Sequence, residues 1–176
     1  PPFHVDLLLG VATYWREFFL AHGDLDRVYV PVGMGSGICS AIRVRDLMGL
    51  QTKIYAVVAE QAPAYAESFR QRRIVSRPAR TLLADGLACS TPDENALEMI
   101  CHGVEGVVTV AEADIAAAMR LYFQTTHNVA EGAAAAALAA LSKDQSALGL
   151  KIGLPLTGGN VDADVFAQVL AEQYPA

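Results

Sequence analysis

Two glycine-rich segments each follow a short apolar run and precede a run with helical spacing. The first is Gly33-Met34-Gly35-Ser36-Gly37, and the second is Thr157-Gly158-Gly159-Asn160. The first suits an anion such as a phosphate group, because glycines leave backbone N–H groups accessible and a helix N-terminus behind them favours negative charge. The second adds a hydroxyl, which can hydrogen-bond a heteroaromatic nitrogen while remaining neutral. Glycines after strands also form ordinary turns, so each segment alone is a weak indication.

The elements around these segments predict a parallel sheet. Buried strands are expected at 27–32, 53–59, 106–110 and 150–156, because these apolar runs lack the alternation of half-exposed strands. Helices are expected at 5–22, 38–48, 63–71, 93–102, 111–126 and 131–141, with a last one from about residue 162. Strands that alternate with helices indicate an α/β fold, here a three-layer sandwich around a mostly parallel sheet. Both glycine-rich segments would then lie at the carboxyl edge of the sheet, where ligands bind.

The first segment does not match the common nucleotide-binding motifs. A G-x-G-x-x-G motif would need glycine at position 38, which is Ile38, and no Gly-Lys-Ser/Thr follows. Glu60 could contact a ribose, although it lies further along the chain than the usual spacing of about 20 residues. A non-catalytic nucleotide-binding domain therefore stays open as an alternative.

Composition excludes several classes of protein. The chain has 176 residues, of which 53% are hydrophobic and 18% charged, so a disordered tail is excluded. Its net charge of -6 argues against nucleic acid as a partner. It contains no uncharged apolar run of the roughly 18 residues that a membrane span needs. Cys39, Cys89 and Cys101 form no CxxC pair, which fits a reducing cytoplasm. Because the chain begins Pro1-Pro2-Phe3 without methionine, we expect a piece of a longer protein.

Four segments together resemble a known family. Residues 30–37, Ala84-Asp85-Gly86, residues 129–133 and residues 156–162 are similar, in order and spacing, to motifs of the threonine dehydratase and serine racemase group. These are pyridoxal phosphate enzymes of fold type II, with a tryptophan synthase β-like fold. The resemblance implies that residues 1–176 are the C-terminal portion of the large, cofactor-binding domain. It also implies pyridoxal 5'-phosphate as the cofactor.

The resemblance assigns expected roles to individual residues. Around the cofactor phosphate it places Gly33, Met34, Gly35, Ser36 and Gly37, of which Met34 and Ser36 stand where the family usually has glycine. It places Thr157 and Gly158 at the pyridine nitrogen, Glu131 near the ring and Asp85 near the substrate. A neutral threonine there leaves the ring unprotonated, which suits elimination of a β-hydroxyl. Some relatives bind a divalent cation at positions that correspond to Val58, Ala62 and Ala64, so we expect no metal there.

One required residue is missing from this chain. Pyridoxal chemistry needs a lysine that binds the cofactor covalently. The family's lysine lies far upstream, and neither Lys53, Lys143 nor Lys151 matches it. We therefore expect this chain alone to be inactive. The complete protein would convert L-threonine or L-serine to a 2-oxo acid and ammonia, as a homodimer or higher homo-oligomer in the cytoplasm. Serine racemisation would use nearly the same site and stays an alternative.

Overall fold

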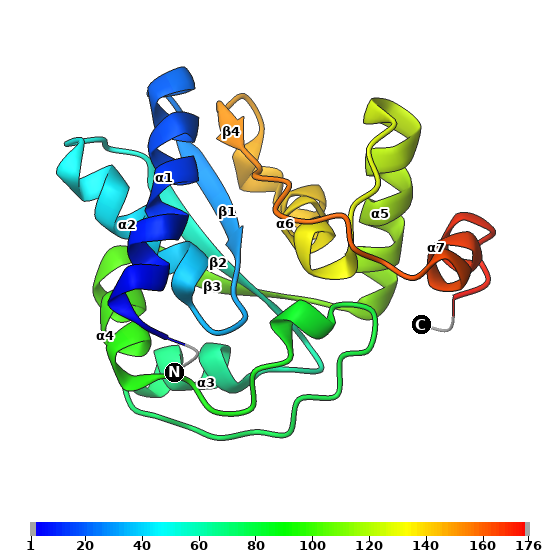
Figure 1. Cartoon of the computed structure of the whole chain (residues 1–176), viewed down its shortest axis with the longest axis horizontal. Helices are drawn as coiled ribbons and strands as arrows, with labels where there is room; N and C mark the ends of the chain where they lie inside the picture. Colours follow the sequence, from blue (N-terminus) through cyan, green and yellow to red (C-terminus); the bar gives the residue numbers. More distant parts are fainter. Residues whose placement is uncertain (1–2, 175–176) are drawn as a thin grey trace.

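Four parallel strands form the centre of the computed structural model, which describes residues 3–174 (Figure 1). The strands are β1 (Arg27–Pro31), β2 (Lys53–Ala59), β3 (Gly106–Val110) and β4 (Ile152–Gly153). Their order in the sheet is β3-β2-β1-β4, so β1 lies between β2 and β4. The glycine-rich segment after β1 and the chain that follows β4 therefore leave the sheet side by side.

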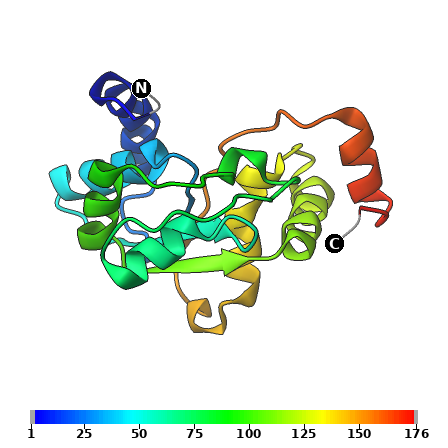
Figure 2. The same ribbon diagram turned by 90° about the horizontal axis from the view of Figure 1, so that it is seen from below.

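Helices cover both faces of this sheet. The α-helices are α1 (Val5–Ala21), α2 (Ser36–Leu47), α3 (Ala64–Gln71), α4 (Glu94–Gly103), α5 (Glu112–Thr126), α6 (Gly132–Lys143) and α7 (Ala163–Leu170). Two short 3-10 helices are η1 (Asp85–Leu87) and η2 (Gln145–Ala147). Helices α1, α2 and α4 lie on one side, and α5 and α6 lie on the other, with α7 outside α5 (Figures 1 and 2). None of these helices is long and apolar enough to cross a membrane.

Side chains of the central strands enter two separate cores. Val28 and Val30 pack with α1, α2 and α4, whereas Tyr29 and Val57 pack with α5 and α6. Both faces of the strands are thus buried, which explains why their sequences are continuously apolar. The predicted three-layer α/β sandwich is confirmed.

The alanine-rich helix α6 lies very close to its neighbours. Five consecutive alanines of this helix, Ala133–Ala137, are all buried. At its first residue, Gly132, a Cβ atom would lie 2.0 Å from the carbonyl oxygen of Leu83. Small side chains permit this approach, and it brings the N-terminus of α6 and the neighbouring η1 to the carboxyl edge of the sheet.

The predicted fourth strand is wrong in its length. The ladder contains only Ile152 and Gly153, which pair with β1, and the chain is irregular from Leu154 onward. Pro155 cannot donate to a strand ladder, and β4 has β1 as its only partner among the described residues. Helix α2 also begins at Ser36 and not at Ile38, because Gly35 already turns the chain into the helix.

A buried polar cluster fixes the connection between α6 and β4. Arg27 on β1 is only 8% exposed, and its Nη1 atom donates to the Asp144 carboxylate at 2.5 Å. The Tyr29 hydroxyl donates to the same carboxylate oxygen, and the Arg27 guanidinium lies 4.6 Å from the centre of the Tyr55 ring. Ser146 donates to the second carboxylate oxygen through its backbone and its hydroxyl. The segment that leads into β4 is thereby attached to β1.

Candidate cofactor site

The segment after β1 is shaped by a left-handed glycine. Gly35 has a φ of 101° and is the residue immediately before helix α2, so it supplies no side chain to cap the helix. The first amides of a helix have no partner within it, and here no side chain caps them. These amides and the positive end of the helix dipole are suited to an anion. Met34 has no positive φ, so the side chain at this position does not strain the backbone.

Two glycines of this segment are required by contact. A Cβ on Gly33 would lie 2.1 Å from the carbonyl oxygen of Gly86 in η1. A Cβ on Gly35 would lie 2.9 Å from the Cβ of Ala96 in α4. The loop is therefore enclosed from behind by η1 and α4. Its remaining side faces a cavity, which Gly33, Met34, Gly35, Ser36 and Gly37 all line.

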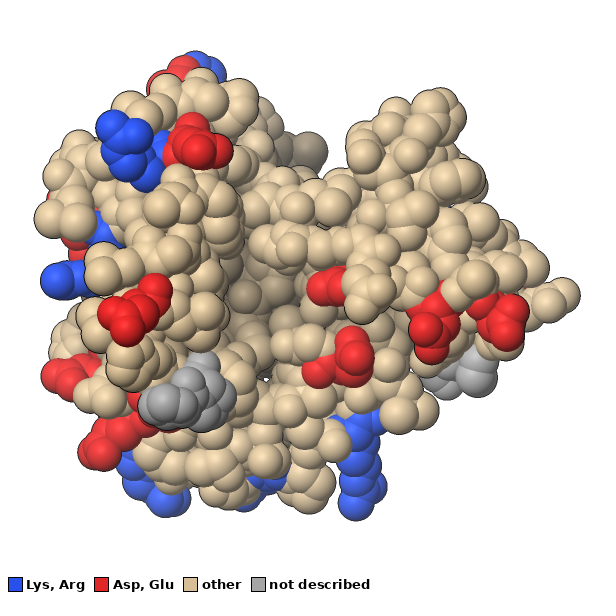
Figure 3. All heavy atoms as spheres, viewed as in Figure 1, with Lys and Arg blue, Asp and Glu red and all other residues tan. Residues whose placement is uncertain are grey.

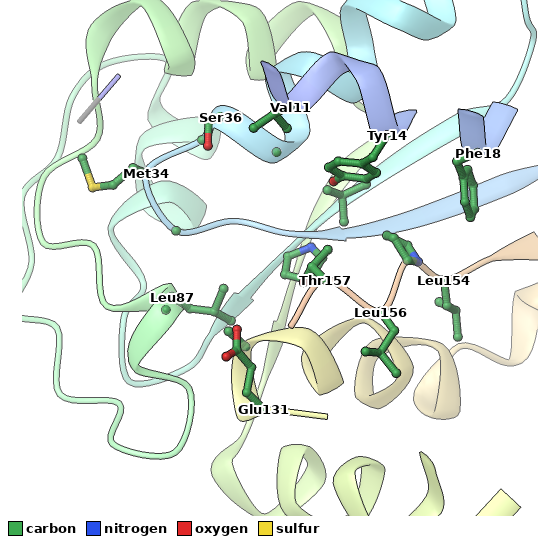
Figure 4. Close-up of a pocket in the computed structure, with 18 of the residues that line it drawn as sticks. Val11, Tyr14, Phe18, Met34, Ser36, Leu87, Glu131, Leu154, Leu156 and Thr157 are labelled. Atoms are coloured by element: carbon green, nitrogen blue, oxygen red, sulfur yellow. The ribbon is translucent and has the colours of Figure 1, made fainter. Parts of the chain in front are cut away.

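The second glycine-rich segment reaches the same cavity. Thr157 is exposed and lines the cavity together with Leu154, Pro155 and Leu156. The cavity has a volume of ≈ 700 Å³, and Ser36 and Thr157 enter it from two sides (Figure 4). Since β1 and β4 are neighbours, one ligand can contact both segments. The sheet order and this shared cavity agree with the expectation that both segments lie at one edge.

Glu131 connects the second segment to helix α6. It is the residue before the helix, and its backbone N–H donates to the carbonyl of Gly158 at 3.1 Å. Its carboxylate lies against the same residue, since a Cβ on Gly158 would be 2.5 Å from Oε1. Glu131 lines the cavity and its carboxylate points toward Leu87 (Figure 4). Gly158 does not line the cavity, but its lack of a side chain leaves room for this carboxylate.

Asp85 lies outside this group. It is exposed, and its carboxylate accepts a hydrogen bond from the backbone of Gly86 at 2.8 Å. It does not line the cavity, whereas the next two residues, Gly86 and Leu87, do. A contact of Asp85 with a substrate therefore stays a prediction.

The cavity has residues that the sequence did not single out. Helix α1 supplies Val11, Tyr14, Glu17 and Phe18, and the chain beyond β4 adds Leu154. Burial raises the pKa of Tyr14, so its hydroxyl is neutral at ordinary pH. The helical spacing of residues 5–22 predicted their helix but gave no signal that these side chains would face a ligand.

The charged groups on the cavity wall are acidic. Among the described residues its charged members are Glu17 and Glu131, with no lysine or arginine. Figure 3 shows a hollow in this face whose walls are mostly uncharged, while lysines and arginines lie toward the margins. Lys53 lies 3.8 Å from Glu105, and Lys143 pairs with Asp114 at 2.5 Å. On the described part of the wall, the groups that can bind an anion are backbone amides and hydroxyls.

A metal site is not formed by the described part of the chain. Within residues 3–174 no cluster of three or more His, Cys, Asp or Glu side chains could hold a metal ion.

These donors fit a phosphate ester attached to a heteroaromatic ring. The uncapped N-terminus of α2 and the Ser36 hydroxyl can bind the phosphate without a counter-charge. Thr157 offers a neutral hydroxyl on the neighbouring segment, and Leu87, Ala133 and Leu156 supply apolar surface for a ring. The site therefore has an anion end and a neutral polar end within one cavity.

Known proteins are similar to this chain in sequence and in fold. The family described as "Pyridoxal-phosphate dependent enzyme" matches residues 1–158. L-threonine ammonia-lyase of Thermotoga maritima is 30% identical over 165 residues, which cover 93% of this chain and 41% of that protein. Phenylserine dehydratase of Ralstonia pickettii is 33% identical over 168 residues, which cover 93% of this chain and 51% of that protein. The chain thus spans about half the length of these curated relatives.

Solved structures of known proteins have the same fold. A threonine deaminase from T.th. superposes with a TM-score of 0.82 at 28% identity, covering 88% of this chain and 57% of that one. Maize serine racemase gives a TM-score of 0.84 over 94% of this chain and 54% of that one, and its 24% identity supports the fold alone. The predicted fold type II architecture is confirmed.

Proposed function

This chain belongs to the family of pyridoxal-phosphate dependent enzymes, and we propose from that premise that the complete protein is an ammonia-lyase for a small β-hydroxy amino acid. With L-threonine, the α-proton and β-hydroxyl leave as water, and hydrolysis of the resulting enamine releases ammonia and 2-oxobutanoate. With L-serine the product would be pyruvate. Curated relatives that carry out this class of reaction support the proposal.

The observation that carries the proposal is the shared cavity of the α2 N-terminus and Thr157. When bound, pyridoxal phosphate supplies an electron sink for the electrons of the Cα–H bond. Gly33–Gly37 would hold its phosphate, and Thr157 would face its ring nitrogen. Because a threonine hydroxyl is neutral, it would not protonate this nitrogen, which supports β-elimination over transamination. Glu131 would lie beside the ring, with Gly158 leaving space for its carboxylate.

The charge of the wall supports a substrate with a neutral side chain. Relatives act on threonine, phenylserine or 3-hydroxyaspartate, as their names state. A β-carboxylate would meet no cation on the described part of this wall, only Glu17 and Glu131, and apolar side chains beside them. We therefore propose threonine or serine as the substrate, with Asp85 on the substrate side. Assembly as a homodimer in the cytoplasm is part of the same proposal.

The covalently bound lysine would come from a segment outside these 176 residues. Lys53 begins β2 and Lys151 immediately precedes β4, so both lie at the opposite edge of the sheet from the cavity. Lys143 ends α6 and pairs with Asp114. The share of the relatives' length that this chain leaves uncovered, about half, is long enough to supply such a residue.

Two alternatives remain testable. A serine racemase would use the same residues and release no 2-oxo acid. A nucleotide-binding domain would need Glu60, which does not line the cavity, so the structure gives this alternative no support.

The decisive experiment uses the complete protein. Formation of 2-oxo acid from L-threonine, L-serine and L-threo-3-hydroxyaspartate is measured with and without added pyridoxal phosphate. We expect cofactor-dependent product from the first two and much less from the third. Inversion of serine without 2-oxo acid would instead establish a racemase, and saturable nucleotide binding without either activity would support the second alternative.

A further inference from the structure

We propose that Trp15 and Tyr65 are positioning residues that hold the loop of Gly33–Gly37 in its anion-binding form before any cofactor is bound. Each donates one hydrogen bond to a carbonyl of this loop, one at Gly37 and one at Met34. Neither lines the cavity, so neither would contact the cofactor. The proposal rests on the assignment of this loop to the cofactor phosphate, and it does not depend on which amino acid the enzyme uses.

Trp15 holds the end of the loop that enters α2. It lies on α1, its side chain is fully buried, and its Nε1–H donates to the Gly37 carbonyl at 2.8 Å. The indole is stacked on Phe19 with ring centres 5.5 Å apart, and Phe18 meets it edge-on at 5.4 Å. These contacts leave the indole no alternative orientation without disturbing the core. The first turn of α2 is thus fastened to α1.

Tyr65 holds the other end of the loop from a different helix. It lies on α3, is 2% exposed, and its hydroxyl donates to the Met34 carbonyl at 3.0 Å. The oxygen sits directly behind Gly35, where a Cβ would lie 3.0 Å from it. Burial raises the pKa of this hydroxyl, so it remains a donor throughout the pH range in which the protein would work. The residue also helps to explain why position 35 is glycine.

These two contacts also help to determine the direction of the N–H groups that follow the Met34 and Gly37 carbonyls. In a trans peptide the C=O and the following N–H point to opposite sides, and the described residues contain no cis bond. Because the Met34 carbonyl points toward Tyr65, the N–H of Gly35 points away from it. Gly37 lies in the first turn of α2, where the helix directs its carbonyl toward the C-terminal end and the N–H of Ile38 toward the N-terminal end, and Trp15 adds a side-chain hydrogen bond to that carbonyl. Donors, and not acceptors, are therefore presented to a phosphate.

Two buried donors on separate helices make the loop rigid where its own sequence is flexible. Three of its five residues are glycine, whose backbone loses more entropy on ordering than that of any other residue. A loop already ordered by Trp15 and Tyr65 would not incur this cost when phosphate binds. Removing either donor should therefore weaken phosphate binding even though no ligand contact is lost.

The test compares Tyr65→Phe with a matched control, Tyr122→Phe, in the complete protein freed of cofactor. Tyr122 is 8% exposed, and its hydroxyl has no hydrogen-bond partner among residues 3–174, so its removal should leave binding unchanged. Affinities for inorganic phosphate, pyridoxal phosphate and pyridoxal are measured by calorimetry. We expect Tyr65→Phe to bind the two phosphate-containing ligands about 5-fold more weakly, the value of one neutral hydrogen bond. Binding of pyridoxal, which lacks the phosphate, should be unchanged.

Trp15→Phe provides a second variant, since it keeps an aromatic ring and removes the N–H donor. It should show the same selective loss of phosphate affinity. Unchanged phosphate affinity in both variants would overturn the proposal, and so would an equal loss for pyridoxal, which would mean a general structural effect. Lyase activity with unaltered phosphate binding in the variants would defeat this inference alone. Selective phosphate loss in a protein without lyase activity would defeat only the proposed function.

Discussion

Replacing Asp144 by alanine should destabilise the protein more than loss of any surface ion pair. The carboxylate accepts hydrogen bonds from Arg27, Tyr29 and Ser146. The variant would leave the Arg27 guanidinium buried, with the Tyr29 hydroxyl, the Ser146 hydroxyl and the Tyr55 ring as its remaining contacts. A buried charge that loses its counter-ion is costly, so the effect should be large.

The magnitude follows from the burial of the two side chains. Breaking a fully buried ion pair costs about 3–5 kcal/mol. The Asp144 side chain is 25% exposed and that of Arg27 only 10%, so water can replace part of the lost interaction. We expect a loss of about 2–3 kcal/mol in the free energy of unfolding. At a typical urea dependence of about 2 kcal/mol per molar, the midpoint should fall by roughly 1 M.

Acid should remove this difference. Hydrogen bonds from Ser146 and Tyr29, with the charge of Arg27, hold the pKa of Asp144 below its ordinary value of 3.8. A lowered carboxyl pKa contributes stability above the ordinary value, and this stability is lost as the pH falls through the lowered pKa. The difference between wild type and variant should therefore begin to shrink as the pH falls below about 4, and it should disappear only below the lowered pKa.

Equilibrium urea unfolding at pH 7 and at pH 3 measures both effects. Asp24→Ala serves as the control, because Asp24 forms an exposed ion pair with Lys151 and its removal should leave the midpoint at pH 7 nearly unchanged. A loss below about 1 kcal/mol at pH 7, or a difference that persists undiminished at pH 3, would contradict the predicted role of Asp144.

Three further predictions concern the candidate site. Gly35→Ala should reduce phosphate affinity by roughly tenfold or more, because the left-handed φ and the contact with Ala96 both oppose a side chain there. Phosphate titration by calorimetry measures this affinity, and an unchanged value would contradict the role of the loop. Gly158→Ala should displace the Glu131 carboxylate with little loss of stability, because the atom it meets is the end of a flexible side chain; a crystal structure of the variant with Glu131 unmoved would disprove this. Thr157→Ala should leave the thermal midpoint unchanged, since the residue is exposed, but it should shift the absorption spectrum of the bound cofactor. An identical spectrum would mean that Thr157 does not contact the ring nitrogen.

The sequence predicted the central strands and the helices well because their signals are local. The runs at 53–59 and 106–110 are strands with these very bounds, and the helix expected at 93–102 is α4, which Asp93 caps with its side chain. The strand expected at 150–156 failed because apolar composition does not reveal how many neighbours a strand has. With β1 as its only partner in the described chain, the ladder ends at Gly153.

Part of the candidate site could likewise be predicted from the sequence, and part could not. Glycines and a threonine after strands could be placed at one sheet edge from topology alone, and the shared cavity agrees with that placement. The contacts of Trp15 and Tyr65 could not be foreseen, because they join residues that are 22 and 31 positions apart through tertiary contacts. Asp85 does not line the cavity, and its carboxylate accepts a hydrogen bond from the next amide, so its place near a substrate stays a prediction.

Because β4 has only two residues, the segment of Thr157 should unfold locally more easily than the loop of Gly33–Gly37. The glycine loop follows an interior strand and is tied to two helices, whereas Thr157 follows a strand held by a two-residue ladder at the margin of the sheet that residues 3–174 form. Segments with so few backbone contacts open locally at a small fraction of the global unfolding energy. The amide hydrogens of Gly153, Leu154, Leu156 and Thr157 should thus exchange with solvent much sooner than those of β1. A ligand that contacts both segments would slow amide exchange most in the segment of Thr157. This segment would therefore become ordered only when the ligand binds.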